Sequence, residues 1–343
     1  MTNSDSKIAT KNFLLRYLID VKERIGITKK EMWMRLETRV IIALIIIFAI
    51  FTFISKEFIG PRILPGILLL GAELGIIAMG EALLIISGEI DISVASVYGW
   101  GVLIGTQLTN MGLPFPISVL AALAFGCFAG FLNGFITLKF KIPSLITTLG
   151  SMWILRGLLI GLFGGHFFSY RGKESLLLNL LGGKIAFIPK LFFWFLGLGI
   201  IFSLLLTYTK FGNWVLATGG NKETARALGV NTNKIKLMCF MIASALAAFA
   251  GTAYLARTKW FMTRVGMSRL GYGLEIEAIC VAVMGGTSFF GGIGSIIAVC
   301  LAALAFSSFK TGLILAGVSG YWVDGGVAIL LIVFCILQGI KRL

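Results

Sequence analysis

The stretch PGILLLGAELGIIAMGEALLII, residues 65–86, decides the fold class of this chain. As an α-helix it is long enough to cross about 30 Å of hydrocarbon. Similar apolar stretches recur from residue 40 to residue 340, separated by short polar or glycine-rich breaks. Of the 343 residues, 58% are hydrophobic and 13% are charged, and the mean hydropathy is +0.96. Lipid is the solvent that accommodates so much apolar surface, so we predict an all-α polytopic membrane protein.

The pattern predicts about ten transmembrane helices, some of them broken or re-entrant. Lys and Arg are more frequent in the gaps that face the cytoplasm if the N-terminus lies inside, which predicts that both termini are cytoplasmic. A basic cluster, Arg257, Lys259, Arg264 and Arg269, opposes this bias because it lies in an outer gap. The predicted spans are 39–54, 65–86, 93–108, 115–138, 144–162, 190–208, 235–256, 272–286, 290–309 and 320–339.

We divide the chain into a cytoplasmic amphipathic segment, 1–38, and a single transmembrane domain, 39–340. Within the first segment, the apolar residues of 7–25 have helical spacing, typical of a helix on the membrane surface, although a solvated tail fits them too. The domain contains a long cytoplasmic loop, 209–234. There Asn221 is suited to cap a short helix over 222–228, and Gly229 to end it. A plain interfacial helix is the alternative.

Two segments interrupt the simple pattern of spans. SGEIDISVAS (87–96) and MGGTSFFGGIGS (284–295) each join two spans with almost no loop. Each follows a span that contains an acidic residue and alanine, Glu81-Ala82 and Glu277-Ala278. We interpret the pairs 65–108 and 272–309 as an internal repeat, a feature that transporters often use around their solute pathways.

Acidic residues inside or beside apolar spans are the main candidates for function, because a charge there normally lines a cavity, finds a partner or marks a pathway. The alternatives are an N-cap role for Asp91 and burial as a neutral or paired group for Glu81 and Glu277. Interhelical hydrogen bonding is the alternative for the uncharged polar groups. The acidic candidates are Glu73, Glu81, Glu89, Asp91, Glu275, Glu277 and Asp324. The predicted pathway and gate residues are Glu81, Glu89, Asp91, Ser93, Asn133, Thr148, Glu277 and Thr287.

Several other functions are disfavoured. The net charge of +15 comes from basic residues between apolar spans, so we interpret them as topology determinants and not as a nucleic-acid site. The five cysteines lie in apolar spans, and His166, in a predicted external loop, has no second ligand nearby, so neither a disulfide set nor a metal site is expected. No GxxxxGK[ST], GxSxG or HExxH motif is present, which argues against nucleotide binding or catalysis by this chain.

Four segments resemble the permease subunits of bacterial ABC importers of the ribose/xylose/arabinose type. They are SGEIDISVAS (87–96), FKIPSLITTLGSMWILRGLLIG (140–161), GGNKETARALGVNTNKIK (219–236) and GYGLEIEAICVAVMGGTSFFGGIGS (271–295). Pro143, Ser144 and the pair Arg156-Gly157 match the family pattern. Glu89 and Ala95 stand where the family often has glycine. The resemblance covers nearly the whole chain after residue 60.

The resemblance implies a bacterial cytoplasmic membrane protein that binds no cofactor and catalyses no reaction itself. A second permease copy, identical or paralogous, would complete the path, and two cytoplasmic subunits would bind ATP and Mg²⁺. An extracytoplasmic binding protein would deliver the solute. The resemblance places the gate at 87–93 and the coupling helix at 222–229. The residues expected to contact the ATPase are Asn221, Glu223, Ala225, Arg226 and Gly229. The residues expected to meet the binding protein are Arg257, Lys259, Arg264 and Arg269, with anchoring at the lipid headgroups as the alternative.

The function expected from the resemblance is uptake of a monosaccharide, such as the pentoses ribose or xylose. Import of a nucleoside or a sugar-like signalling molecule by the same architecture is a second hypothesis. A third is a proton-coupled secondary transporter that uses its membrane carboxylates. An intramembrane enzyme is disfavoured, because the sequence shows no nucleophile–base or metal pair.

Overall fold

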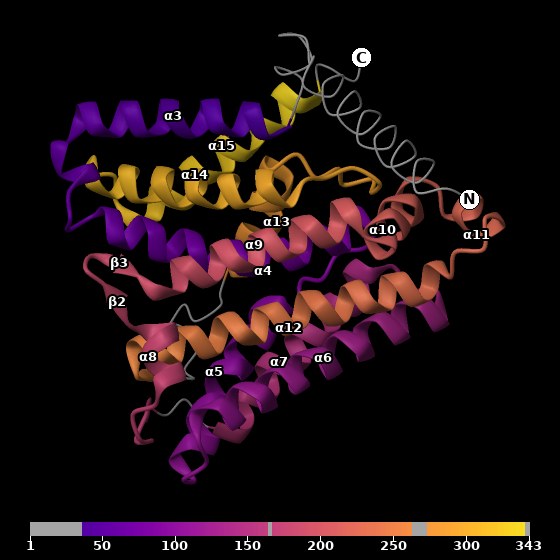
Figure 1. The fold of residues 1–343 in the computed structure, drawn as a ribbon, viewed down its shortest axis with the longest axis horizontal. Helices are drawn as coiled ribbons and strands as arrows, with labels where there is room; N and C mark the ends of the chain where they lie inside the picture. Colours follow the sequence, from indigo (N-terminus) through magenta and orange to yellow (C-terminus); the bar gives the residue numbers. More distant parts are fainter. Residues whose placement is uncertain (1–35, 164–166, 263–272, 340–343) are drawn as a thin grey trace, which may run out of the picture.

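A computed structural model describes residues 36–163, 167–262 and 273–339, and nearly all of them are helical (Figure 1). Seven of the described helices are long and apolar enough to cross a membrane. The predicted N-terminal helix, His166, Arg264 and Arg269 lie outside the described residues. The long helices are α3 (Leu36–Ile54), α4 (Leu64–Ile86), α5 (Val94–Asn110), α6 (Phe115–Phe140), α7 (Ser144–Phe163), α9 (Lys190–Tyr208), α12 (Thr232–Thr258), α13 (Leu274–Met284), α14 (Ile296–Leu315) and α15 (Gly320–Gly339).

Each predicted span is helical over most of its length, but two differ from the prediction. Helix α13 has 11 residues, too few to cross the bilayer alone, and α14 begins at Ile296 instead of residue 290. The cause lies in Gly291 and Gly292, whose positive φ angles of 80° and 75° keep the chain out of the helix. Ser295 then caps α14 by accepting a hydrogen bond from the amide of Ala298.

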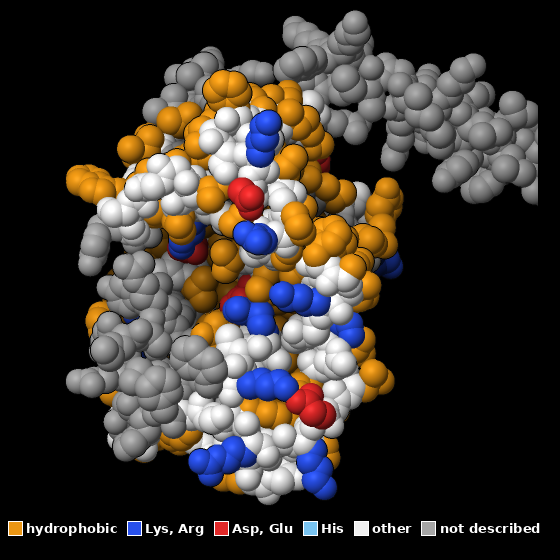
Figure 2. Space-filling view, turned by 90° about the vertical axis from the view of Figure 1, so that its left-hand side faces the viewer, with side chains coloured by type: hydrophobic (Ala, Val, Ile, Leu, Met, Phe, Trp, Pro, Cys, Tyr) orange, Lys and Arg blue, Asp and Glu red, His pale blue; other side chains and the backbone are white. Residues whose placement is uncertain are grey.

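The predicted loops also contain regular structure. The predicted long loop, 209–234, is largely helical, with α10 (Lys210–Gly220) followed by α11 (Lys222–Ala227). At the opposite end of the molecule lie η1 (Lys56–Ile59), α8 (Leu176–Gly182) and two small antiparallel pairs. Strand β1 (Phe167–Ser169) pairs with β4 (Trp260–Met262), and β2 (Lys184–Ile185) pairs with β3 (Ile188–Pro189). Figure 2 shows this end, with Lys and Arg side chains spread over it.

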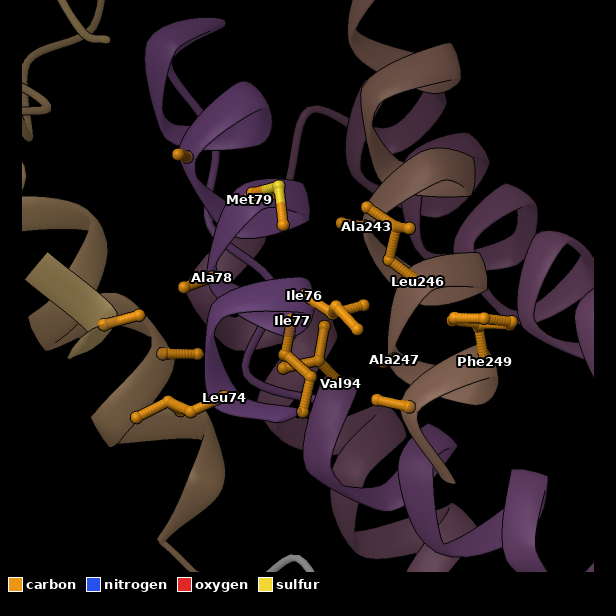
Figure 3. Packing of buried hydrophobic residues seen from close by; sticks show 14 of the residues in the cluster. Leu74, Ile76, Ile77, Ala78, Met79, Val94, Ala243, Leu246, Ala247 and Phe249 are labelled. Atoms are coloured by element: carbon orange, nitrogen blue, oxygen red, sulfur yellow. The ribbon is translucent and has the colours of Figure 1, made fainter. Parts of the chain in front are cut away.

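Helices α4 and α12 form the centre of the fold, with α3 and α14 on one side and α5, α6 and α7 on the other (Figure 1). Figure 3 shows the buried side chains of α4, among them Ile77 and Met79, packed near Ala243 and Leu246 of α12. Small residues permit this closeness. A Cβ at Gly80 would lie 2.7 Å from the Cα of Ala243. Close backbone approach at small residues is the usual packing mode of helices in lipid, where no hydrophobic effect drives association.

Candidate functional site

A buried polar cluster lies where the turn after α4 meets α6 and α12. The carboxylate of Asp91 accepts hydrogen bonds from the Ser93 amide at 2.8 Å and the Ser93 hydroxyl at 2.6 Å. It also accepts from Ser244 Oγ of α12 at 3.1 Å and from Asn133 Nδ2 of α6 at 3.3 Å. All four residues are buried. Three of the predicted pathway residues, Asp91, Ser93 and Asn133, are thus brought together, and Ser244 is a member that the sequence analysis missed.

The local sequence explains how Asp91 reaches this position. We expected it as a possible N-cap of the helix that begins near Ser93. Ser93 itself is the N-cap of α5, and Asp91 instead accepts from the amide two residues further along the chain, an Asx-type turn. The N-terminus of α7 holds the same turn through two hydrogen bonds of 3.2 Å. Ser144 Oγ accepts one from the amide of Ile90, and Thr148 Oγ1 accepts the other from the amide of Ile92. Thr148, another predicted pathway residue, therefore supports the turn.

Glu81 adds a second carboxyl group to the cluster. Its side chain is fully buried, and Oε2 accepts a long hydrogen bond, 3.4 Å, from the amide of Asp91. Among the described residues, Oε1 has no hydrogen-bond partner. Glu81 and Asp91 thus lie close together, and within the described part of the chain no basic side chain is bonded to either. Such an arrangement is costly in a low-dielectric interior and contrasts with every other acidic candidate whose side chain the structure describes.

Those other acidic candidates form ion pairs. Arg257 Nη2 lies 3.2 Å from Glu73, which also accepts from the hydroxyl of Tyr98, and Arg156 lies 3.1 Å from Glu275. The remaining two pairs are Glu277 with Lys310 and Glu89 with Lys236.

The pair of Glu89 and Lys236 joins the turn after α4 to the start of α12. Lys236 Nζ lies 2.6 Å from Glu89 Oε1, and their side chains are only 8% and 14% exposed. Lys236 falls at the edge of the predicted span 235–256, and α12 begins three residues before that span, at Thr232. Lys222 at the start of α11 lies near this pair. Burial, and the positive charges of Lys236 and Arg226, lower the pKa of its ammonium group.

The turn after α13 repeats the geometry of the turn after α4. Gly88 and Gly286 both have φ of +88°, and each ends its helix with the same two backbone hydrogen bonds, from its own amide and from that of the next residue. The same pair of bonds also ends the helices before Gly112, Gly229 and Gly317, so this geometry is a general helix end and the internal repeat stays a prediction. Glu81 and Glu277 also lie at different distances along the chain from Gly88 and Gly286, so the two acidic residues are not counterparts. Thr287, which follows Gly286, is buried, and its hydroxyl has no partner among the described residues.

The segment around α11 has the cap expected from its sequence. Asn221 Oδ1 accepts from the amides of Glu223 and Thr224 at 3.1 and 3.0 Å. The helix ends at Ala227, slightly earlier than predicted, and Gly229 takes a φ of +85°. Ala225 is buried and Leu228 is 79% exposed. The Arg226 guanidinium donates to Thr232 Oγ1 and Asn233 Oδ1 at 2.9 Å, which ties α11 to the first turn of α12.

The two described residues of the basic cluster that was predicted to lie outside, Arg257 and Lys259, both form ion pairs. Arg257 is bound to Glu73, and Lys259 pairs with Glu174 at the surface. Further exposed basic side chains, Arg171, Lys173 and Lys184, lie on the connections around α8. Among the described residues, no group of three or more His, Cys, Asp or Glu side chains is placed to hold a metal ion.

Comparison with known proteins identifies the family. Residues 63–336 match the family described as branched-chain amino acid transport system permease components. The xylose/arabinose import permease protein XylH of Sulfolobus acidocaldarius is 32% identical, over 87% of this chain and 84% of its own length. Autoinducer 2 import system permease proteins LsrC are similarly related. That of Shigella flexneri is 29% identical, over 89% of this chain and 87% of its own length, and that of Photorhabdus luminescens is 30% identical, over 89% of this chain and 90% of its own length. No solved structure matches. The chain therefore belongs to this family of ABC-importer permeases, of the sugar-import type, and is a multi-pass protein of the cell membrane.

Proposed function

We propose that this chain is the non-catalytic permease subunit of an ATP-driven, binding-protein-dependent importer of a monosaccharide, a pentose such as ribose or xylose. The observation that carries the proposal is the Asp91 cluster, a buried polar group at the junction of α6, α7, α12 and the turn after α4. The xylose/arabinose permease among the relatives supports the choice of a pentose.

The cluster has the chemistry that a sugar requires. A sugar hydroxyl both donates and accepts hydrogen bonds, and the cluster offers a carboxylate acceptor in Asp91 and donors in Asn133 and Ser244. In the structure these groups satisfy one another. If the surrounding helices separate, the solute hydroxyls replace the lost partners, so that no buried polar group is left unpaired.

The proposed assembly contains two permease copies, two ATPase subunits that bind ATP and Mg²⁺, and an extracytoplasmic binding protein. In this arrangement the ten spans place both termini and α10–α11 on the cytoplasmic side. The capped helix α11, with its buried Ala225 and exposed Leu228, is the element proposed to contact the ATPase.

Two alternatives keep specific support. The autoinducer 2 permeases among the relatives favour a sugar-like signalling molecule, and a nucleoside belongs to the same class of hypothesis. The closely placed Glu81 and Asp91, with no basic partner for either among the described residues, are the feature that favours proton coupling.

Reconstitution tests the proposal directly. The chain is purified with its ATPase and binding-protein partners and placed in liposomes, and uptake of labelled pentoses, hexoses, nucleosides and autoinducer 2 is measured. We expect ATP-dependent accumulation of a pentose that requires the binding protein. Uptake driven by a pH gradient without the ATPase would overturn the proposal, and accumulation of another solute in the panel would correct the substrate.

A further inference from the structure

Three segments that are far apart in the sequence meet through their backbones beside α11, the proposed coupling helix. They are the last turn of α10, the end of α4 and the loop before α14. The amide of Gly292 donates a hydrogen bond to the carbonyl of Ile86 at 2.8 Å. Gly219 lies against both, since a Cβ built on it would be 1.7 Å from the Ile86 carbonyl oxygen and 2.6 Å from the Gly292 nitrogen. We call Gly219, Ile86 and Gly292 the glycine junction.

The junction lies at both broken-helix turns at once. Ile86 is the last residue of α4, directly before the turn that contains Asp91, and Gly292 belongs to the connection between α13 and α14. On the third side, Gly219 is separated from Asn221, the cap of α11, by Gly220 alone. A displacement of α11 therefore reaches the junction along a very short length of chain.

A second connection runs in parallel through side chains. Arg226 of α11 is bonded to Thr232 and Asn233 in the first turn of α12. Lys236, one turn further along α12, is paired with Glu89 of the turn after α4, and its Nζ would lie 3.6 Å from a Cβ at Gly88. The pair thus positions this turn relative to α12.

Backbone contact makes the junction stiff. A side chain between two elements rotates or changes rotamer when one element shifts, whereas backbone atoms in van der Waals contact leave no such freedom. Packed rigid elements are one way in which coupling between distant sites is carried, and the junction joins three of them.

We propose that the glycine junction, together with the Glu89–Lys236 pair, transmits movement of α11 to both broken-helix turns. Gly219 and Lys236 act as positioning residues, and this inference rests on the proposed coupling role of α11. The solute moved per ATP hydrolysed is the decisive quantity, because a purely structural defect lowers the amount of working complex and leaves this ratio unchanged.

The first test is Gly219→Ala in the complex with its ATPase and binding protein. We expect the complex to assemble and hydrolyse ATP while the solute transported per ATP falls at least about tenfold, a change in barrier that a shift of the packed backbone readily produces. Gly182→Ala is the matched control, because its Cβ would lie 2.1 Å from the Ala256 carbonyl oxygen at the opposite end of the molecule. Gly197→Ala, with no atom within 4 Å of its Cβ, is the permissive control. A normal ratio in Gly219→Ala, or an equal fall in Gly182→Ala, would overturn the inference.

The second test changes the ion pair and leaves the glycine junction intact. Glu89→Lys and Lys236→Glu should each lower the solute transported per ATP, and the double exchange should restore at least half of it. Failure of the double exchange to improve on either single variant would remove the ion pair from the inference. A parent complex that transports without ATP would instead refute the proposed function, which separates the two outcomes.

Discussion

Replacing Asp91 by alanine tests whether the buried cluster is the structural centre of the translocation path. The substitution removes one acceptor and strands three donors: the amide of Ser93, the hydroxyl of Ser93 and the hydroxyl of Ser244. Each buried unsatisfied donor costs about 1–3 kcal/mol. The lower end of this range gives a total of about 3 kcal/mol, which is more than a hundredfold in the equilibrium population of the packed arrangement.

Removing one donor should cost much less. In Ser244→Ala the carboxylate keeps the hydrogen bonds from Ser93 and Asn133, so no group is stranded and the expected loss is about 1 kcal/mol. Asp91→Asn keeps one acceptor oxygen and should fall between the two. The expected order is therefore parent, Ser244→Ala, Asp91→Asn, Asp91→Ala.

Two measurements check this order. Thermal unfolding midpoints of the purified protein report the packing of the cluster, and ATP-driven uptake by reconstituted complexes reports its function. The control is Ser308→Ala, which removes a buried hydroxyl bonded to a carbonyl within its own helix, α14. Equal midpoints and uptake in Asp91→Ala and the parent would refute the reasoning, since no arrangement of stranded donors is neutral.

Three further predictions concern the two ends of the molecule. Ala225→Leu should abolish transport without preventing membrane insertion, because the buried face of α11 has no room for a larger side chain; normal uptake would remove the coupling assignment. Arg257→Ala should lower the unfolding midpoint far more than Lys259→Ala. The first variant leaves buried Glu73 without its cation, whereas the second breaks an ion pair at the surface. Equal midpoints in the two variants would contradict this prediction. Reversing Arg264 and Arg269 to glutamate should weaken stimulation of ATP hydrolysis by the binding protein, most at low salt, and equal stimulation across a salt titration would leave them as interface anchors.

The apolar pattern was sufficient to predict the helices because their length is set by the bilayer and not by local propensity. The prediction of α9 agrees at both ends, 190–208. Boundaries failed where conformation depends on special residues or on tertiary contacts. The late start of α14 follows from two glycines with positive φ, and Lys236, at the edge of a predicted span, forms a buried ion pair with the turn after α4. A lysine beside a helix start gives no signal in a single sequence that it is buried.

The candidate site was predictable only in part. Asp91, Ser93 and Asn133 were identified because polar groups at membrane depth are expensive, and the structure brings them within hydrogen-bonding distance. Ser244 was missed because a serine in an alanine-rich span is an ordinary packing residue. The glycine junction could not be foreseen at all, since its three members are distant in sequence and their contact involves only backbone atoms.

The hydrogen bonds of the Asp91 cluster fall into a local and a long-range set, and this division limits how a path could open. Ser93 belongs to the same turn as Asp91 and moves with it, whereas Asn133 and Ser244 lie on α6 and α12. Moving the turn away from these helices therefore breaks only the long-range bonds, including the 2.8 Å bond from Asn133 Nδ2 to Ser93 Oγ, and each is worth about 1 kcal/mol. A solute with adjacent hydroxyls replaces the two donors that Asp91 loses. A solute without them leaves Asp91 partly unsatisfied. In the proposed importer, the same carboxylate thus keeps the path closed when empty and favours a polyhydroxylated solute when it opens.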